Sequence, residues 1–162
     1  MPISLVVNNI PFEYPSPGDS PGWGQPATDW ASEVTLVLTE LFGPNDLAET
    51  TFNIANNISA FTNVAGLLIN TGAVRSADIS YSVYRTSTSN PSGFSESGII
   101  NVTYDNLAAS GSKWSLIQYG INGSSGVIFN ITDGGQVQYK SSDLGATGYS
   151  GVMHYRVKTL GQ

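Results

Sequence analysis

Hydrophobic and polar positions follow two different periods along the chain, and the change falls near residue 45. In residues 27–44, "ATDWASEVTLVLTELFGP", apolar side chains recur at alternating steps of three and four, with acidic residues on the other side. This spacing predicts an amphipathic α-helix with Thr28 as its cap, acidic residues in its first turn and a stop at Gly43 and Pro44. The apolar face of this helix consists of Ala27, Trp30, Val34, Val37 and Leu41.

After Asn45 the period falls to two, which is typical of strands. In "RSADISYSVYRTS" the side chains at 77, 79, 81 and 83 alternate with mostly polar neighbours, so one face of this strand should lie on a core. Hairpin turns are predicted at Asn122-Gly123 and at Asp133-Gly134-Gly135, because these residues accept positive φ. Further strand candidates are "TTFNIAN", "VAGLLIN", "SGIINVTYD", "KWSLIQYGI", "GVIFNITD", "QVQYKS" and "SGVMHYRVKTL".

These patterns together predict a mainly β fold. Its body is expected to be an antiparallel β-sandwich that is jelly-roll-like, preceded by a Pro/Gly-rich extended arm and one short α-helix. Seven of the eight prolines lie in the first 44 residues, and proline fixes φ and removes donors. We therefore expect a short strand at residues 3–8, then an arm without regular structure. Two domains are predicted: residues 1–49, the arm plus helix, for anchoring and oligomerisation, and residues 50–162, the β-sandwich.

Large aromatic side chains are spread along this N-terminal part of the chain. An extended arm has no core of its own, and proline-stiffened segments lose little entropy when their rings dock on another surface. The rings should therefore be covered by a groove on the same domain, by a neighbouring copy or by a second protein. The helix either packs on its own sandwich or meets copies from neighbouring subunits. The predicted partner-binding residues are Phe12, Tyr14, Trp23, Trp30, Val34, Val37 and Leu41.

The charge and composition narrow the choice of partner. The formal net charge is −6, and residues 1–74 contain seven acidic residues and no Lys or Arg. Nucleic acid is therefore a poor partner, since binding a phosphate backbone requires clustered cations, and a surface that receives the arm should be neutral or basic. There is no apolar run of the roughly 18 residues that a membrane span needs, and no basic secretory leader. The absence of cysteine excludes disulfides and thiolate metal sites.

Candidate catalytic residues are few. His154, the only histidine, lies at a polar position of "GVMHYRV", and the chain has no GxSxG motif for a serine nucleophile. Glycoside cleavage needs two neighbouring carboxyl groups, and the sequence offers Glu96, Asp105, Asp133 and Asp143, each expected to be a solvated turn residue. The turn at Asp133 lacks the dense oxygen ligands of a calcium loop. We therefore expect no enzymatic activity, no cofactor and no metal.

Several phrases of the sequence resemble a known group of proteins. They are "IPFEYPSPGDSPGWGQPATDWASEVTLVL", "VRSADISYSVYRTS", "GVIFNITDGGQVQYKSSDLG" and "YSGVMHYRVKTL". The group is the small virion proteins of tailed bacteriophages, namely capsid decoration (cement or head-fibre) proteins and trimeric tail-fibre domains with a jelly-roll-like module. This resemblance implies a homotrimer without enzymatic activity, assembled in the host bacterial cytoplasm and fixed to the virion by its N-terminal part.

Three functions follow as hypotheses. In the first, the chain is a decoration protein that binds the major capsid protein or another virion protein through its arm and stabilises the head by mass action. In the second, it is the receptor-binding module of a tail fibre, and loops near Phe94 or Tyr149 bind cell-surface glycan. A hydrolase of surface polysaccharide ranks last because the sequence offers no catalytic constellation.

Overall fold

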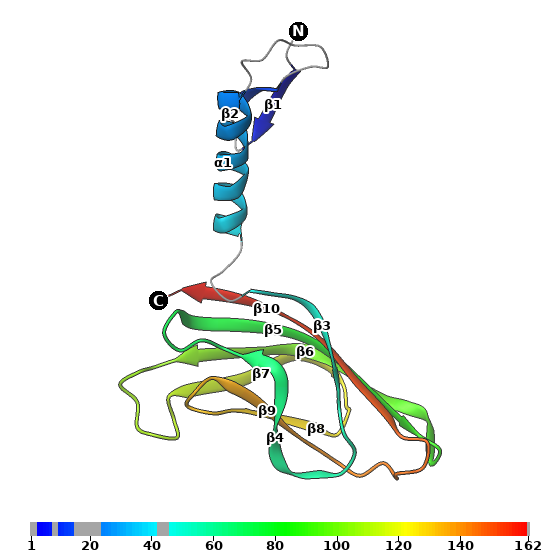
Figure 1. Ribbon diagram of the computed structural model, residues 1–162. Helices are drawn as coiled ribbons and strands as arrows, with labels where there is room; N and C mark the ends of the chain where they lie inside the picture. The colour runs from blue at the N-terminus through cyan, green and yellow to red at the C-terminus, as the bar shows by residue number, and fades with distance from the viewer. Residues whose placement is uncertain (1–2, 8–9, 15–23, 42–45, 162) are drawn as a thin grey trace. The chain divides into compact units, whose positions relative to one another are not determined.

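The structure of the protein is a computed structural model that describes residues 3–7, 10–14, 24–41 and 46–161 and divides the chain into two compact units, residues 1–42 and 43–162. In the first unit, strand β1 (Ile3–Val7) pairs antiparallel with β2 (Ile10–Tyr14), with Leu5 opposite Phe12. Helix α1 (Gly24–Leu41) contacts β2 and β1 (Figure 1). The first unit is thus a hairpin with a helix against it.

Two expectations about this unit are wrong. Residues 10–14 form a strand and not an irregular arm. Pro11 is accepted there because each strand of a two-stranded sheet is an edge strand. The helix starts at Gly24, so Thr28 lies inside it and its first turn contains no acidic residue. Pro26 fits this earlier start, because the first-turn N–H groups have no partner within a helix.

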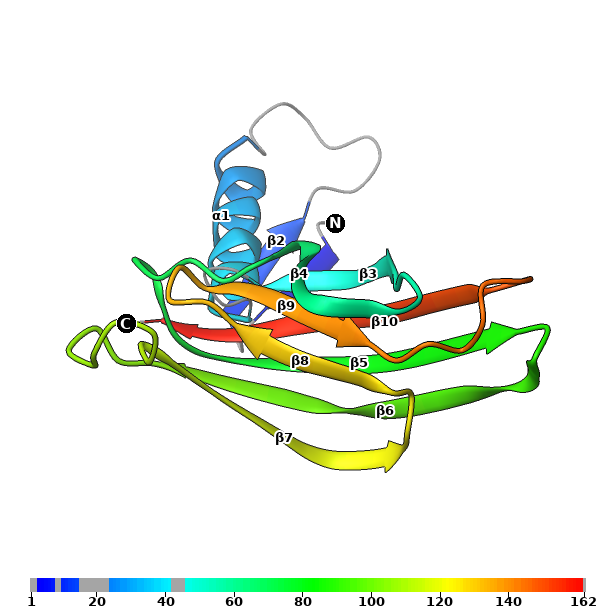
Figure 2. The same ribbon diagram turned by 90° about the horizontal axis from the view of Figure 1, so that it is seen from below.

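The second unit is an antiparallel β-sandwich, which confirms the predicted fold class. Figure 2 shows a smaller sheet lying over a larger one. The larger sheet has the order β3-β10-β5-β6-β7. In this order β10, the last strand of the chain, pairs with β5, the first of three consecutive antiparallel strands. The five strands are β3 (Leu47–Asn53), β5 (Val74–Ser87), β6 (Asn90–Tyr104), β7 (Trp114–Gly123) and β10 (Ser150–Gly161).

The smaller sheet has the order β4-β9-β8, and its turn between β8 and β9 is the hairpin predicted at Asp133-Gly134-Gly135. The prediction of a hairpin at Asn122-Gly123 is wrong. These residues end β7, which belongs to the larger sheet, and the chain then crosses to β8 in the smaller sheet. The three strands are β4 (Ile58–Leu68), β8 (Val127–Ile131) and β9 (Gln136–Ser141).

The core lies between the two sheets and draws on both. On β5 the burial alternates as the sequence predicts, with Ala77, Ile79, Tyr81 and Val83 inward. Fully burying a side chain such as that of Ile79 or Val83 stabilises the fold by roughly 1.5–3 kcal/mol. Facing residues from the smaller sheet include Val64, Leu67, Val127, Phe129, Ile131, Val137 and Tyr139.

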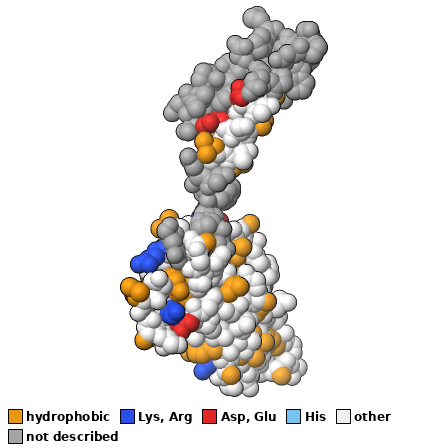
Figure 3. All heavy atoms as spheres, turned by 60° about the vertical axis from the view of Figure 1, so that its left-hand side comes forward, with side chains coloured by type: hydrophobic (Ala, Val, Ile, Leu, Met, Phe, Trp, Pro, Cys, Tyr) orange, Lys and Arg blue, Asp and Glu red, His pale blue; other side chains and the backbone are white. Residues whose placement is uncertain are grey.

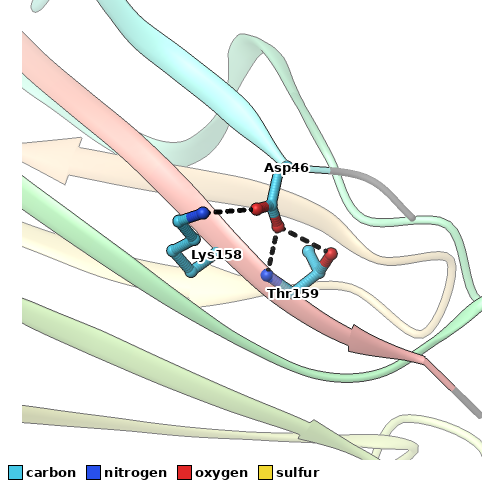
Figure 4. Close-up of polar contacts among 3 residues, drawn as sticks. All are labelled: Asp46, Lys158 and Thr159. Atoms are coloured by element: carbon cyan, nitrogen blue, oxygen red, sulfur yellow. Dashed lines mark hydrogen bonds and ion pairs between the residues drawn. The ribbon is translucent and has the colours of Figure 1, made fainter. Parts of the chain in front are cut away.

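Asp46, just after the boundary between the units, fixes the entry of the chain into the sandwich (Figure 4). Its Oδ1 accepts hydrogen bonds from the backbone N (2.6 Å) and the Oγ1 (3.0 Å) of Thr159. Its Oδ2 pairs with Lys158 Nζ at 2.9 Å. Because both partners lie on β10, the start of β3 is held to its neighbouring strand by side-chain contacts as well as by the backbone ladder.

Gly135 joins the hairpin between β8 and β9 to the end of β4. Its carbonyl accepts a hydrogen bond from Ile69 N at 2.9 Å, and its φ is +83°. A methyl group added at Gly135 would overlap the backbone carbonyl oxygen of Ile69. This close approach of two backbones therefore requires glycine for two reasons, conformation and space.

Replacing Gly135 by alanine should lower the free energy of unfolding by about 3 kcal/mol or more, because the change adds a backbone clash to the left-handed conformation. Gly111 is the matched control, since its φ is +86° and a methyl group there meets nothing within 4 Å. Gly111→Ala should cost only the conformational share, about 1–2 kcal/mol. Denaturant unfolding curves of the two variants measure the difference, and equal losses would contradict the clash.

Candidate functional site

The outward face of the larger sheet carries two adjoining hollows. One has a volume of about 390 Å³, and its lining includes Glu49, Ser80, Ser82, His154 and Arg156. The other has a volume of about 260 Å³, and its lining includes Ser82, Tyr84, Ser95, Ser97, Asn122 and His154. Because Ser82 and His154 line both hollows, we treat the two together as one outer groove.

The outer groove is built by strand register. Ser82 on β5 lies opposite His154 on β10 and opposite Ser97 on β6, and Ser97 lies opposite Asn122 on β7. These residues therefore form a row across four strands, on the side of the sheet that faces away from the core. Figure 3 shows that uncharged polar side chains and backbone dominate the visible surface of the sandwich, with few charged groups.

His154 lies exposed on this face, as the alternation in "GVMHYRV" predicts. Its Nδ1 lies 3.2 Å from Thr51 Oγ1 and 3.6 Å from Glu49 Oε1. Both neighbours come from β3, which pairs with β10 along this edge of the sheet. The contacts thus join β10 to β3 on the outward face of the sheet.

Glu96 is not the solvated turn residue that the sequence predicts. It lies inward on β6 and is buried. The burial is tolerated because three donors satisfy its carboxylate. Oε1 accepts from the hydroxyl of Tyr81 at 2.7 Å, and Oε2 accepts from the backbone N (2.8 Å) and Oγ (2.9 Å) of Ser125. Burial, and next the contact with Glu96, raise the pKa of the Tyr81 hydroxyl. Glu96 thus holds the loop after β7 to the core.

The other candidate acids hold turns, as expected. Asp133 accepts hydrogen bonds from the backbone N of Gly111 and of Lys113, and these two bonds lower the pKa of its carboxyl group. Asp105 accepts from Leu107 N at 2.9 Å, and Asp143 accepts from Gly145 N at 2.8 Å. In the described part of the chain, no three His, Asp or Glu side chains are grouped so that they could hold a metal ion.

The burial of Arg85 is a main feature of the sandwich that the sequence did not predict. Arg85 takes the next inward position of β5 after Val83, and it is 0% exposed. Its guanidinium donates to neutral oxygens of three connections: Asn56 after β3, Ser125 after β7, and Ser142 and Tyr149 after β9. The five distances are 3.2 Å to Asn56 Oδ1, 2.7 Å to Ser125 O, 3.2 and 2.6 Å to Ser142 Oγ and O, and 3.0 Å to the Tyr149 hydroxyl.

Removing this guanidinium should destabilise the protein strongly. Arg85→Ala leaves several buried acceptors without donors, so the free energy of unfolding should fall by about 3 kcal/mol or more. Arg85→Lys should recover only part of the loss, because an ammonium cannot reproduce the planar fork of donors. Arg75, an exposed arginine on the same strand, is the control, and Arg75→Ala should stay within about 0.5 kcal/mol of wild type. Equal, small losses at both positions in denaturant unfolding would contradict the role of Arg85.

The predicted partner-binding residues lie in the first unit. Phe12 and Tyr14 are in β2, and Trp23 lies outside the described residues. Trp30, Val34 and Val37 are half-buried in α1, and Leu41 is its last residue. The interaction surface of these residues stays a prediction.

The helix also exposes two apolar side chains that the predicted face omits. Leu36 is 50% exposed and Leu38 is 47% exposed. With 3.6 residues per turn, Leu38 lies about 40° from Val34 around the helix, whereas Leu36 lies about 160° from it. The run "VTLVL" could have predicted these exposed leucines, because it places apolar residues on several sides of the helix. Such a helix needs more than one partner to cover it.

The sequence offered Phe94 and Tyr149 as candidate glycan-binding residues, and Tyr149 instead contacts other residues of the sandwich. Its hydroxyl donates to the carbonyl of Ile54 at 2.8 Å, and its ring lies 5.5 Å from the guanidinium carbon of Arg85. Phe94 is exposed on β6. The exposed ring on the outer groove is instead that of Tyr84.

No helix in the described part of the chain is both long and apolar enough to cross a membrane.

Comparisons with known proteins give a weak structural likeness. No protein-family model matches the chain, and no curated protein matches its sequence. Among solved structures, the tailspike protein of Acinetobacter phage vB_ApiP_P1 has a TM-score of 0.36 and 10% sequence identity over 72% of this chain. The matched part covers only 22% of the tailspike chain. The likeness is to a phage tail protein, and at this TM-score it does not establish a shared fold or function.

Proposed function

We propose that the protein is a non-enzymatic structural protein of a tailed-phage virion, in which residues 1–42 attach the chain and the sandwich is the projecting domain. The observation that carries this proposal is the division of the chain into two units of different character. Residues 1–42 contain five acidic and no basic residues, a net charge of −5, whereas residues 43–162 contain seven acidic and six basic residues, a net charge of −1. Almost all of the net charge therefore belongs to the smaller unit.

Both units expose apolar side chains. The sandwich buries a core between its two sheets and still exposes residues such as Leu107 (90%) and Leu160 (70%). In the first unit, the exposed Leu36 and Leu38 lie on the unit that carries most of the negative charge. An acidic surface with exposed apolar side chains fits a neutral or basic protein surface, both by burial and by charge.

Within this class we propose capsid decoration, with the major capsid protein or another virion protein as the partner. A protein that binds only the assembled shell stabilises it by mass action. A second candidate function, the receptor-binding module of a tail fibre, is favoured by one observation, the outer groove with its exposed tyrosine.

Removal of residues 1–42 tests the attachment. The truncated chain keeps Asp46 and its bonds to Thr159 and Lys158, so the sandwich should stay folded and unfold cooperatively on heating. It should no longer co-sediment with emptied heads of the phage that encodes it, whereas the full chain should. Undiminished co-sedimentation of the truncated chain would reject attachment through the first unit.

We further propose that the protein is a homotrimer and that the Leu38 side of α1 forms the contact. The acids Asp29 and Glu33 lie on the side of Leu36, within about 60° of it around the helix. Copies that meet through Leu38 therefore keep these like charges apart.

Light scattering of the full chain at micromolar concentration should give about three chains per particle. Leu38→Asp should dissociate the particle, because it places a charge in the proposed contact. Leu36→Asp, a matched change on the acidic side of the same helix, should leave the trimer intact. A monomeric wild-type protein, or equal effects of the two changes, would refute this contact.

A further inference from the structure

Tyr84 presents a supported aromatic ring at one end of the outer groove. It occupies an outward position of β5, and 49% of the residue is exposed. On the neighbouring strand β6, a methyl group added at Gly93 would lie only 2.8 Å from the Cε2, Cζ and hydroxyl oxygen of Tyr84. The ring therefore rests against the backbone at Gly93, which leaves no room for a side chain. This support fixes the ring while half of the residue stays open to solvent.

The wall beside this ring supplies uncharged hydrogen-bonding groups. Ser95 lies opposite Tyr84 in the register, and the row Ser82, Ser97 and Asn122 follows next to it. A serine hydroxyl and an asparagine amide can each both donate and accept. Within the described residues, none of these four side chains makes a hydrogen bond to another protein group, so their capacity is available to a ligand. Of the groups that line this hollow, the carboxylate of Glu96 is turned inward, so the ionisable groups on the outward face are His154 and the Tyr84 hydroxyl.

We propose that this part of the outer groove, the Tyr84 hollow, binds a neutral saccharide. A sugar ring has an apolar C–H face, which can stack on an aromatic ring, and a rim of hydroxyls, each of which donates and accepts. The Tyr84 hollow offers the complementary pair, one supported ring and a set of hydroxyl and amide groups. The proposal gives a ligand class to the second candidate function and rests on that function, while attachment through residues 1–42 is measured separately.

Size and charge favour a neutral saccharide over other ligand classes. The volume of about 260 Å³ lies below the range of pockets for drug-sized ligands, so it suits a single sugar unit of a longer chain. Residues 43–162 have a net charge of −1 and no described Lys or Arg lines the Tyr84 hollow, so nothing there would attract an anionic saccharide. A protein partner would need a larger surface with an apolar centre, and this wall is made of serines and asparagine.

The test is binding of the purified full chain to a printed array of neutral and acidic saccharides, followed by titration with the best neutral one. Tyr84→Ala should weaken binding at least roughly tenfold, because it removes the stacking surface. Tyr84→Phe should stay within about threefold of wild type, because the ring remains. Tyr119→Ala is the matched control, since Tyr119 is another outward tyrosine, 44% exposed, on β7 and outside the lining of the hollow.

A second variant separates loss of the ring from its displacement. Gly93→Ala keeps Tyr84 but pushes its ring out of place, and it should weaken binding as Tyr84→Ala does. Thermal unfolding checks that each variant is folded. No binding to any printed saccharide, binding to acidic saccharides alone, or binding that Tyr84→Ala leaves unchanged would each overturn the proposal. Co-sedimentation of Tyr84→Ala with phage heads should match wild type, so a failed saccharide site and a failed attachment function give different results.

Discussion

The buried guanidinium of Arg85 is the interaction on which one end of the sandwich depends. Its acceptors lie in three separate connections, after β3, β7 and β9, so the conformations of all three are tied to one side chain. Ser125 then links it to Glu96, because its carbonyl accepts from Arg85 while its backbone N and hydroxyl donate to the carboxylate. Two opposite charges are thereby buried near each other and joined through one residue. A buried charge is tolerated only when its hydrogen-bonding groups are satisfied in this way.

The same residues fix the outer groove, because neighbouring positions on a strand point to opposite faces. Arg85 points inward, so Tyr84 points outward. Glu96 points inward, so Ser95 and Ser97 point outward. The inward network thus sets the register and the position of the strands that carry the outward groups. The polar outer groove is therefore supported from within by the buried network of Arg85 and Glu96.

The sequence predicted those features that local periodicity and turn chemistry determine. The alternation of β5, the hairpin at Asp133 and the antiparallel sandwich are of this kind. The burial of Arg85 could not be predicted from the sequence. A charged side chain two positions after Val83 suggests that the strand has left the core, and the groups that satisfy Arg85 come from loops distant in the sequence. The turn residues Asn122 and Gly123 likewise do not tell which sheet the next strand will join. In the first unit, Pro11 is tolerated in β2 because both strands of a two-stranded sheet are edge strands, which the local sequence does not reveal.

The uneven distribution of charge suggests that the two units would respond differently to their surroundings. Attraction between the acidic first unit and a basic surface would weaken with salt, since exposed charges are screened over about 8 Å at physiological ionic strength. Stacking and hydrogen bonding of a neutral sugar in the Tyr84 hollow involve no net charge, so salt should affect them little. A chain that has a net charge of −5 in residues 1–42 and a wall of uncharged serine and asparagine side chains in the Tyr84 hollow can therefore make one contact that depends on ionic conditions and another that does not.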